Sequence, residues 1–327
     1  MLNRRQALSA GAGLLAAGAA FRRADAEAID KVAHIIVGFP AGGGTDIVAR
    51  VLAEALKGTY AASVIVENKP GASARLAVEY VKNAPPDGSV MLFTPDFPIT
   101  LYPFSFKSLN YDPVKDFIAV GPAAKGMLTF NIGPGVPDSV KTLADFVAWC
   151  RANPTKANYA TTSAGATPHF TGVMLAREAK VTMTPVHYRG GAPAMEDLIG
   201  GHIAASVNPV SEVIAYAKAG SVRILAVTGA QRSPFLPDVP TMKEAGYDVV
   251  VESLSGIFLP AKTPDSIVAA LSAAMRTAVQ SKAMIESLAK FGTEPAFLEP
   301  GAFSAWIKGE IARWGPVVQA SGFVALE

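Results

Sequence analysis

A glycine-rich loop near the start of the chain has the composition of a turn that binds anions. Residues 40–46 read Pro-Ala-Gly-Gly-Gly-Thr-Asp; they follow a short apolar run and precede apolar residues at helical spacing. A loop between a buried strand and a helix presents unpaired backbone N–H groups and the positive end of the helix dipole. Glycine lacks a Cβ, so a ligand can approach this backbone closely. The loop therefore predicts a site for a carboxylate or another hydrogen-bond acceptor, with Thr45 or Asp46 as the helix N-cap.

The middle of the chain repeats this arrangement. Residues 162–166 read Thr-Ser-Ala-Gly-Ala, and Thr167 and Pro168 follow as the expected N-cap and first helical residue. Two such loops, one in each predicted lobe, suit a ligand with hydrogen-bond acceptors at one or both ends. One helix terminus contributes about 0.3–1 kcal/mol, and up to about 2 when partly buried, whereas micromolar binding needs about 8. Further hydrogen bonds and closure around the ligand must therefore supply the rest.

Polar residues after other predicted strands add to these loops, because ligands gather at the carboxyl ends of parallel strands. Arg189, next to Tyr188, could pair with an anionic ligand or lie solvated on the surface. Asp96 and Asn208 also follow strand ends, and each has a structural and a ligand-binding interpretation. Asp96 facing a cleft would disfavour a dianion and favour a ligand with an amine or a hydroxyl. Asp96, Arg189 and Asn208 are therefore candidate ligand-binding residues, together with Gly42 of the first loop and Tyr188.

Motifs for catalysis, metal binding and nucleic-acid binding are missing from the sequence. It contains no GxSxG or GxxxxGK[ST] motif, and residues 42–47 do not complete a GxGxxG motif. The single cysteine, Cys150, and four scattered histidines provide no metal-ligand spacing. His169 lies close to Ser163 in the sequence, but no orienting acid accompanies them. The net charge of +2 also gives no strongly basic surface, so we expect no binding of nucleic acid. From the missing motifs we expect neither an enzyme nor a metal or cofactor.

Residues 1–26 have the three regions of an export signal. Arg4 and Arg5 precede an apolar run at residues 10–20, and residues 24–26 read Ala-Asp-Ala, a pattern typical of cleavage sites. The arginine pair resembles a twin-arginine signal, although an alanine replaces the usual phenylalanine. The apolar run is shorter than the about 20 residues that span a bilayer. We therefore expect export by the twin-arginine or the general route, cleavage after residue 26, and a soluble protein in the periplasm.

Short apolar strands alternate with amphipathic helices through most of the chain, a pattern typical of α/β proteins with parallel sheets. The last third is mostly helical, and its helices are expected to pack on the first lobe. No flexible linker is present, so two α/β lobes with a cleft between them form the simplest architecture. The predicted strands are residues 35–39, 64–67, 90–94, 127–132, 158–161, 183–187, 203–207 and 223–228; the predicted helices are residues 47–56, 73–82, 142–152, 168–178, 193–199, 266–279, 282–291 and 303–319.

A series of short motifs, in this order, resembles the Bug receptors, which are the extracytoplasmic solute receptors of tripartite tricarboxylate transporters. Each motif is weak alone, but the order of all of them is specific, and together they span nearly all of the chain after the export signal. In this family two glycines usually follow the Pro-Gly-Ala segment, where this chain has Ser73 and Ala74, and a lysine usually occupies the position of Arg189. The matching segments are residues 38–46, 66–72, 86–88, 111–113, 188–193, 225–228, 236–241 and 260–264.

The resemblance implies a two-lobe fold of the periplasmic-binding-protein type II class, also called a Venus flytrap. Lobe 1 would comprise residues 27–122 with 226–327, and lobe 2 residues 123–225, with crossings near 118–124 and 223–228. Such a receptor captures a small organic acid and delivers it to membrane permease subunits on other chains. In this family the two loops hold the ligand, so the resemblance implies ligand contacts at these residues: Phe39, Ala41, Gly43, Thr45 and Asp46 of the first loop, and Thr162, Ser163, Ala166 and Thr167 of the second. We expect a monomer. A ligand-presenting sensor adaptor is the alternative function, and a secreted hydrolase is a third.

Overall fold

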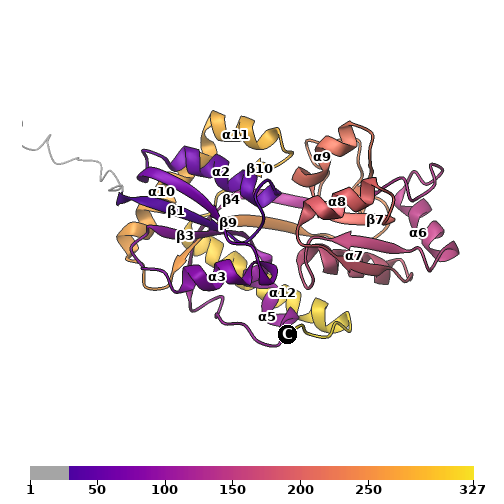
Figure 1. Ribbon diagram of the computed structural model, residues 1–327, viewed down its shortest axis with the longest axis horizontal. Helices are drawn as coiled ribbons and strands as arrows, with labels where there is room; N and C mark the ends of the chain where they lie inside the picture. Colours follow the sequence, from indigo (N-terminus) through magenta and orange to yellow (C-terminus); the bar gives the residue numbers. More distant parts are fainter. Residues whose placement is uncertain (1–28) are drawn as a thin grey trace, which may run out of the picture.

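The computed structural model describes residues 29–327, and the predicted export signal lies outside these residues. The molecule has two α/β lobes side by side (Figure 1). The N-terminal strands belong to one lobe, and the middle of the chain forms the other. The predicted two-lobe α/β architecture is therefore confirmed. Within the described residues, no helix is both long and apolar enough to cross a membrane.

The sheet of the first lobe combines parallel and antiparallel strands. β1 (Ile29–Val37) lies between β2 (Ala61–Asn68) and β3 (Val90–Pro95) and is parallel to both. β3 pairs antiparallel with β9 (Glu252–Pro260), and β9 pairs antiparallel with β4 (Phe117–Ile132). The end of β1 is an unbroken apolar run because it is buried on both faces. The remaining elements of this lobe are α2 (Gly44–Leu56), η1 (Ala72–Ala74), α3 (Arg75–Lys82), α4 (Phe97–Thr100), α5 (Tyr102–Ser105), α10 (Asp265–Gln280), α11 (Lys282–Ala289), β10 (Glu294–Pro295) and α12 (Pro300–Ala320).

The second lobe is built on the last residues of β4. β7 (Ala205–Pro209) pairs antiparallel with β4 and parallel with β5 (Asn158–Thr161), which pairs parallel with β6 (Thr184–His187). β8 (Arg223–Val227) also pairs antiparallel with β4. Crossover helices connect the parallel strands, as the alternating sequence pattern predicts. The helices of this lobe are α6 (Leu143–Ala152), α7 (Thr167–Glu178), α8 (Gly191–Ile199) and α9 (Val210–Lys218).

β4 belongs to the sheets of both lobes. It pairs with β9 as far as Met127 and with β7 from Leu128 onward. The sequence predicts only residues 127–132 of this strand, and it misses β9 and α9. Glycine and proline interrupt the apolar pattern of β4, which hides a strand from pattern analysis. The expected parallel sheets are therefore mixed, because β4 and β9 run antiparallel to their neighbours. The predicted lobe boundaries stay a proposal.

The C-terminal helix α12 contacts both lobes. The sequence predicts that it packs on the first lobe, and its residue Phe303 does so, against Phe258 of β9. Its second half reaches α7 of the second lobe, where the rings of Trp314 and Phe170 lie 6.4 Å apart. Figure 1 shows α12 along the lower side of the molecule, extending from one lobe towards the other.

Three consecutive residues before α3 have left-handed backbone conformations without being glycine. The φ angle is 45° at Ala72, 56° at Ser73 and 70° at Ala74. This conformation is strained for residues with a Cβ. Ala74 is buried against Gly38, where an added Cβ would lie 2.5 Å from the Ala74 Cβ. Tight packing therefore holds the segment in its strained form.

Candidate functional site

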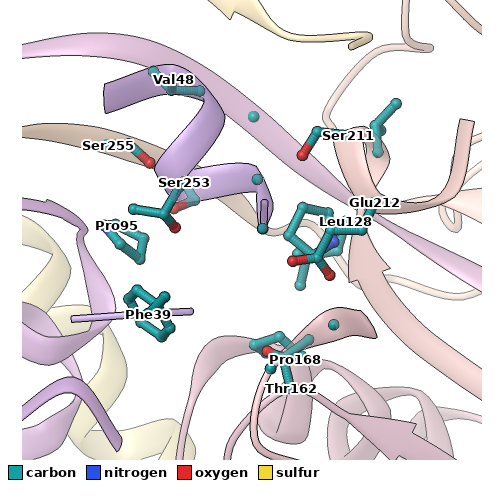
Figure 2. A pocket seen from close by; sticks show the side chains of 18 of the residues that line it. Phe39, Val48, Pro95, Leu128, Thr162, Pro168, Ser211, Glu212, Ser253 and Ser255 are labelled. Atoms are coloured by element: carbon teal, nitrogen blue, oxygen red, sulfur yellow. The ribbon is translucent and has the colours of Figure 1, made fainter. Parts of the chain in front are cut away.

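A cavity of about 150 Å³ is lined by residues from both lobes. Phe39, Thr45 and Pro95 come from the first lobe, and Thr162 and Arg189 come from the second. Figure 2 shows side chains from both parts around one open centre. Most of the lining is apolar or backbone, with a few hydroxyl groups and two charged side chains. Such a composition is typical of sites for small organic molecules.

Four helix N-termini converge on this cavity. The first residues of α2, α7, α8 and α9 all line it: Gly44, Thr167, Gly191 and Val210. None of these four helices is capped by the side chain of its N-cap residue. Their first turns therefore present backbone N–H groups and positive dipole ends to the cavity.

The Thr167 hydroxyl is a further polar group that a ligand could reach. Thr167 is 2% exposed, and its Oγ1 atom is buried without a hydrogen-bond partner among the described residues. A buried hydroxyl without a partner is unfavourable, so such groups are rare in folded proteins. Because this residue also lines the cavity at the start of α7, a ligand with an acceptor group can satisfy it.

Asp46 holds the first glycine loop in place and does not line the cavity. Its Oδ2 atom accepts hydrogen bonds from the Gly42 N–H at 2.8 Å and from Arg50 Nε at 2.9 Å. Its Oδ1 atom accepts a hydrogen bond from Asn68 Nδ2 at 2.9 Å. Burial would raise the pKa of Asp46, but these hydrogen bonds lower it below its ordinary value. The prediction of Thr45 or Asp46 as the N-cap is wrong, because α2 begins at Gly44 and its N-cap is Gly43.

The second loop contributes Thr162 and Thr167 to the cavity lining, whereas Ser163 and Ala166 do not line it. Ala166 is the N-cap of α7 in place of the predicted Thr167, which is the first helical residue. Ser163 Oγ lies 3.4 Å from the Tyr102 hydroxyl. His169 Nδ1 accepts the Gly165 N–H at 3.2 Å. The hydrogen bonds of the described residues thus engage Ser163 and His169 with other partners and form no nucleophile–base pair between them.

Asp96 lies behind the cavity wall. Its carboxylate accepts hydrogen bonds from Ser253 Oγ and from Thr100 Oγ1, the latter at 3.2 Å. Ser253 lines the cavity, whereas Asp96 does not. Burial raises the pKa of Asp96 to about 7, against the lowering effect of the Ser253 hydrogen bond. The structure therefore does not place Asp96 where it would face a ligand directly.

The three remaining predicted residues have different surroundings. Arg189 lines the cavity, is exposed, and has no carboxylate partner within residues 29–327. The Tyr188 hydroxyl donates to Asp197 Oδ2 at 2.6 Å and does not line the cavity. Asn208 donates from Nδ2 to Glu212 Oε2 at 3.0 Å, while its Oδ1 atom is buried without a partner in the described part of the chain.

The predicted residues that line the cavity are Phe39, Ala41, Gly43, Thr45, Thr162, Thr167 and Arg189; those that do not are Gly42, Asp46, Asp96, Ser163, Ala166, Tyr188 and Asn208. Contact with a ligand stays a prediction for all of them. Sequence reasoning missed Glu212, a charged residue of the lining in the first turn of α9. Apolar residues at helical spacing after Pro209 would have indicated α9 and its acidic first turn.

Comparison with known proteins agrees with this geometry. The family model described as "Tripartite tricarboxylate transporter family receptor" matches residues 48–323. The chain belongs to this receptor family. The Bug-type resemblance is thereby confirmed, and the receptor is 29% identical to protein BugT of Bordetella pertussis over 88% of this chain and 89% of that protein.

Two solved structures with bound acids share the fold of the receptor. Rpa4515 of R. palustris, solved with adipate, has a TM-score of 0.86 and 29% identity, and the match covers 90% of this chain and 98% of that one. MatC of Rhodopseudomonas palustris, solved with bound malate, has a TM-score of 0.80 and 28% identity, over 88% of this chain and 98% of that one. The periplasmic binding protein BugD also matches, with a TM-score of 0.84 and 29% identity over 90% of this chain and 99% of that one, which confirms the periplasmic-binding-protein-like fold.

Proposed function

We propose that this receptor captures a small carboxylate-type organic compound in the cavity between its lobes and passes it to the permease subunits of a tripartite tricarboxylate transporter. The observation that carries the proposal is the convergence of four helix N-termini from both lobes on one cavity. Relatives solved with adipate and with malate support the ligand class. The predicted export signal and the periplasmic location in the family support a periplasmic protein.

The magnitudes agree with a binding site of this kind. Glu212 of the chain itself occupies two of the four termini, those of α2 and α8. The two that remain, at about 1 kcal/mol each, supply about a quarter of the roughly 8 kcal/mol that micromolar affinity requires. A hydrogen bond from the Thr167 hydroxyl to a charged carboxylate adds about 1.5–3 kcal/mol. The apolar side chains of the lining, such as Phe39 and Leu128, then contribute by covering the carbon chain of the ligand.

Binding without conversion is the activity that this site supports. The described residues present main-chain donors and hydroxyl groups to the cavity, and Ser163 and His169 are not joined to each other. Neither of these two residues lines the cavity. A ligand would therefore leave the site unchanged.

The experiment is a thermal-shift screen of the mature protein with dicarboxylates, hydroxy acids, aromatic acids and amino acids. We expect one chemical group to raise the melting temperature, with its affinity measured by titration calorimetry and its recovery as unchanged compound by NMR. Thr167→Val should weaken that affinity by about tenfold, whereas Thr182→Val, at an exposed threonine outside the cavity, should not.

Turnover of the ligand, or no stabilisation by any carboxylate in the screen, would refute the proposal. The transport step has its own test. Cells that lack this chain should lose uptake of the identified ligand, and the Thr167→Val chain should restore uptake less well than the natural chain. Normal uptake in the deletion strain would contradict the transport role and leave the binding role intact.

A further inference from the structure

The cavity contains a carboxylate of the chain itself, at Glu212. This residue lies in the first turn of α9, and Figure 2 shows its carboxylate directed towards the open centre. Asn208 Nδ2 donates a hydrogen bond to Glu212 Oε2 at 3.0 Å. The backbone N–H of Gly44 also hydrogen-bonds this carboxylate. Glu212 therefore reaches from the second lobe to the N-terminus of α2 in the first.

The Glu212 carboxylate lies where two helix N-termini meet. A Cβ built on Gly191, the first residue of α8, would lie 2.0 Å from Glu212 Oε2, so the carboxylate contacts the α8 backbone directly. A Cβ built on Gly44, the first residue of α2, would lie 3.8 Å from Glu212 Cγ. An anion at this point is stabilised by both helix dipoles. The protein thus fills with its own acid a position that would otherwise suit a carboxylate of the ligand.

A second anion beside Glu212 is unfavourable, and a cation there is favourable. The attraction or repulsion between two charges grows as the surroundings become less polar, and Glu212 is half-buried in the wall of the cavity. The pKa of Glu212 is raised, because burial outweighs the lowering effect of the hydrogen bonds from Asn208 and Gly44. A positively charged ligand group in contact with the carboxylate would lower that pKa and gain binding energy in return.

The rest of the lining still fits one carboxylate. The N-terminus of α7, with the unpartnered Thr167 hydroxyl, and the exposed Arg189 remain available to it. Apolar side chains, including Phe39 and Leu128, separate the polar groups of the lining. The cavity therefore offers donors for one anionic group and an acceptor, Glu212, for one cationic group.

We propose that Glu212 selects a ligand that carries an amine as well as a carboxylate, so that this receptor binds a zwitterionic amino acid in preference to a dicarboxylate. This inference rests on the proposed binding function. It makes Glu212, through direct contact with the amine, the residue that determines specificity between these two classes of organic acid.

Matched probes test this preference by titration calorimetry at pH 7.5. Dicarboxylates of four to eight carbons are compared with the ω-amino and 2-amino acids of the same length, for example adipate with 6-aminohexanoate and 2-aminohexanoate. The natural protein should bind at least one amino acid about tenfold or more tightly than the dicarboxylate of equal length. Glu212→Gln keeps the shape of the side chain and removes its charge, so this variant should lose that affinity by about tenfold and gain affinity for the dicarboxylate.

Glu196→Gln is the matched control, because Glu196 is an exposed glutamate of the same lobe outside the cavity. This variant should keep the preference of the natural protein. Circular dichroism and the melting temperature without ligand verify that each variant is folded.

Three outcomes would overturn the inference. Tighter binding of a dicarboxylate by the natural protein, or the same order of affinities in Glu212→Gln and the natural protein, would refute the role of Glu212 and leave the proposed function intact. If no probe binds either the natural protein or Glu212→Gln, the proposed function is overturned together with the inference.

Discussion

Replacement of Asp96 by asparagine should change how the stability of the protein depends on pH. The native carboxyl is buried beside Ser253 and Thr100, and its pKa of about 7 exceeds the ordinary value of 3.8. Between these two values the native state keeps a proton that the unfolded chain has released. The stabilising contribution of Asp96 is therefore complete below pH 4 and is lost as the pH rises through 7.

The size of the effect follows from the shift in pKa. One pKa unit corresponds to about 1.36 kcal/mol, so the raised pKa of Asp96 lowers the free energy of unfolding by about 3 kcal/mol between pH 5 and pH 8. The asparagine side chain of the variant has nearly the same shape as the native carboxyl, and its amide can still bond to both hydroxyl groups. The difference in stability between Asp96→Asn and the natural protein should therefore grow by about 3 kcal/mol over this range, in favour of the variant.

Urea unfolding at pH 5 and pH 8 measures this difference directly. Comparing two proteins at each pH removes the contributions of groups that they share, including His169, whose pKa is lowered to about 4 by burial. Asp238→Asn, at an exposed aspartate, is the control and should show a constant difference from the natural protein. A difference for Asp96→Asn that changes by less than about 0.5 kcal/mol would refute the reasoning.

Three further substitutions test the loops and the contact between the lobes. Ala74→Gly should raise the free energy of unfolding in urea by about 1 kcal/mol, since it relieves a left-handed alanine; a loss of stability would contradict this. Asp46→Ala should lower that free energy by about 3 kcal/mol, because buried donors lose their acceptor, and a loss below about 1 kcal/mol would count against an anchoring role. Gly44→Ala should weaken ligand binding about tenfold in calorimetry, because its Cβ would lie 2.5 Å from Ser211 Oγ. Adding Ser211→Ala should restore that binding, and no recovery would show that this contact is not the cause.

The local strand, loop and helix signals were sufficient to predict much of the fold. β5 has the predicted bounds, 158–161, and α3 and α6 differ from prediction by a few residues at their starts. Each of these elements has a clear apolar period and a glycine, proline or polar boundary. β9 and most of β4 were missed because they combine glycine, serine and proline with apolar residues, and their pairing partners are distant in the sequence.

The sequence predicts which backbone segments form the candidate site, but it predicts less well which side chains line the cavity. Glycine loops indicate where helix N-termini face a cavity, because the glycines in the sequence mark positions where a ligand can approach the backbone closely. The direction of a side chain after a strand end is not visible there. Asp46 and Asp96 turn away to internal donors, and Glu212 turns inward from a helix that was not predicted.

The strand β4 has a consequence for how the receptor opens. The pairing of β4 with β9 ends at Met127, and its pairing with β7 begins at Leu128. The chain connects the lobes a second time after β8, where the Val251 N–H donates a hydrogen bond to the Thr228 carbonyl oxygen at 2.8 Å. The two halves can rotate against each other without breaking the hydrogen bonds between strands only if the backbone torsion angles of the few residues around this junction change. Gly126 stands beside it, with no other heavy atom within 4 Å of a Cβ placed there. The fold thus has room at this junction for a change in the angle between its halves that breaks neither sheet.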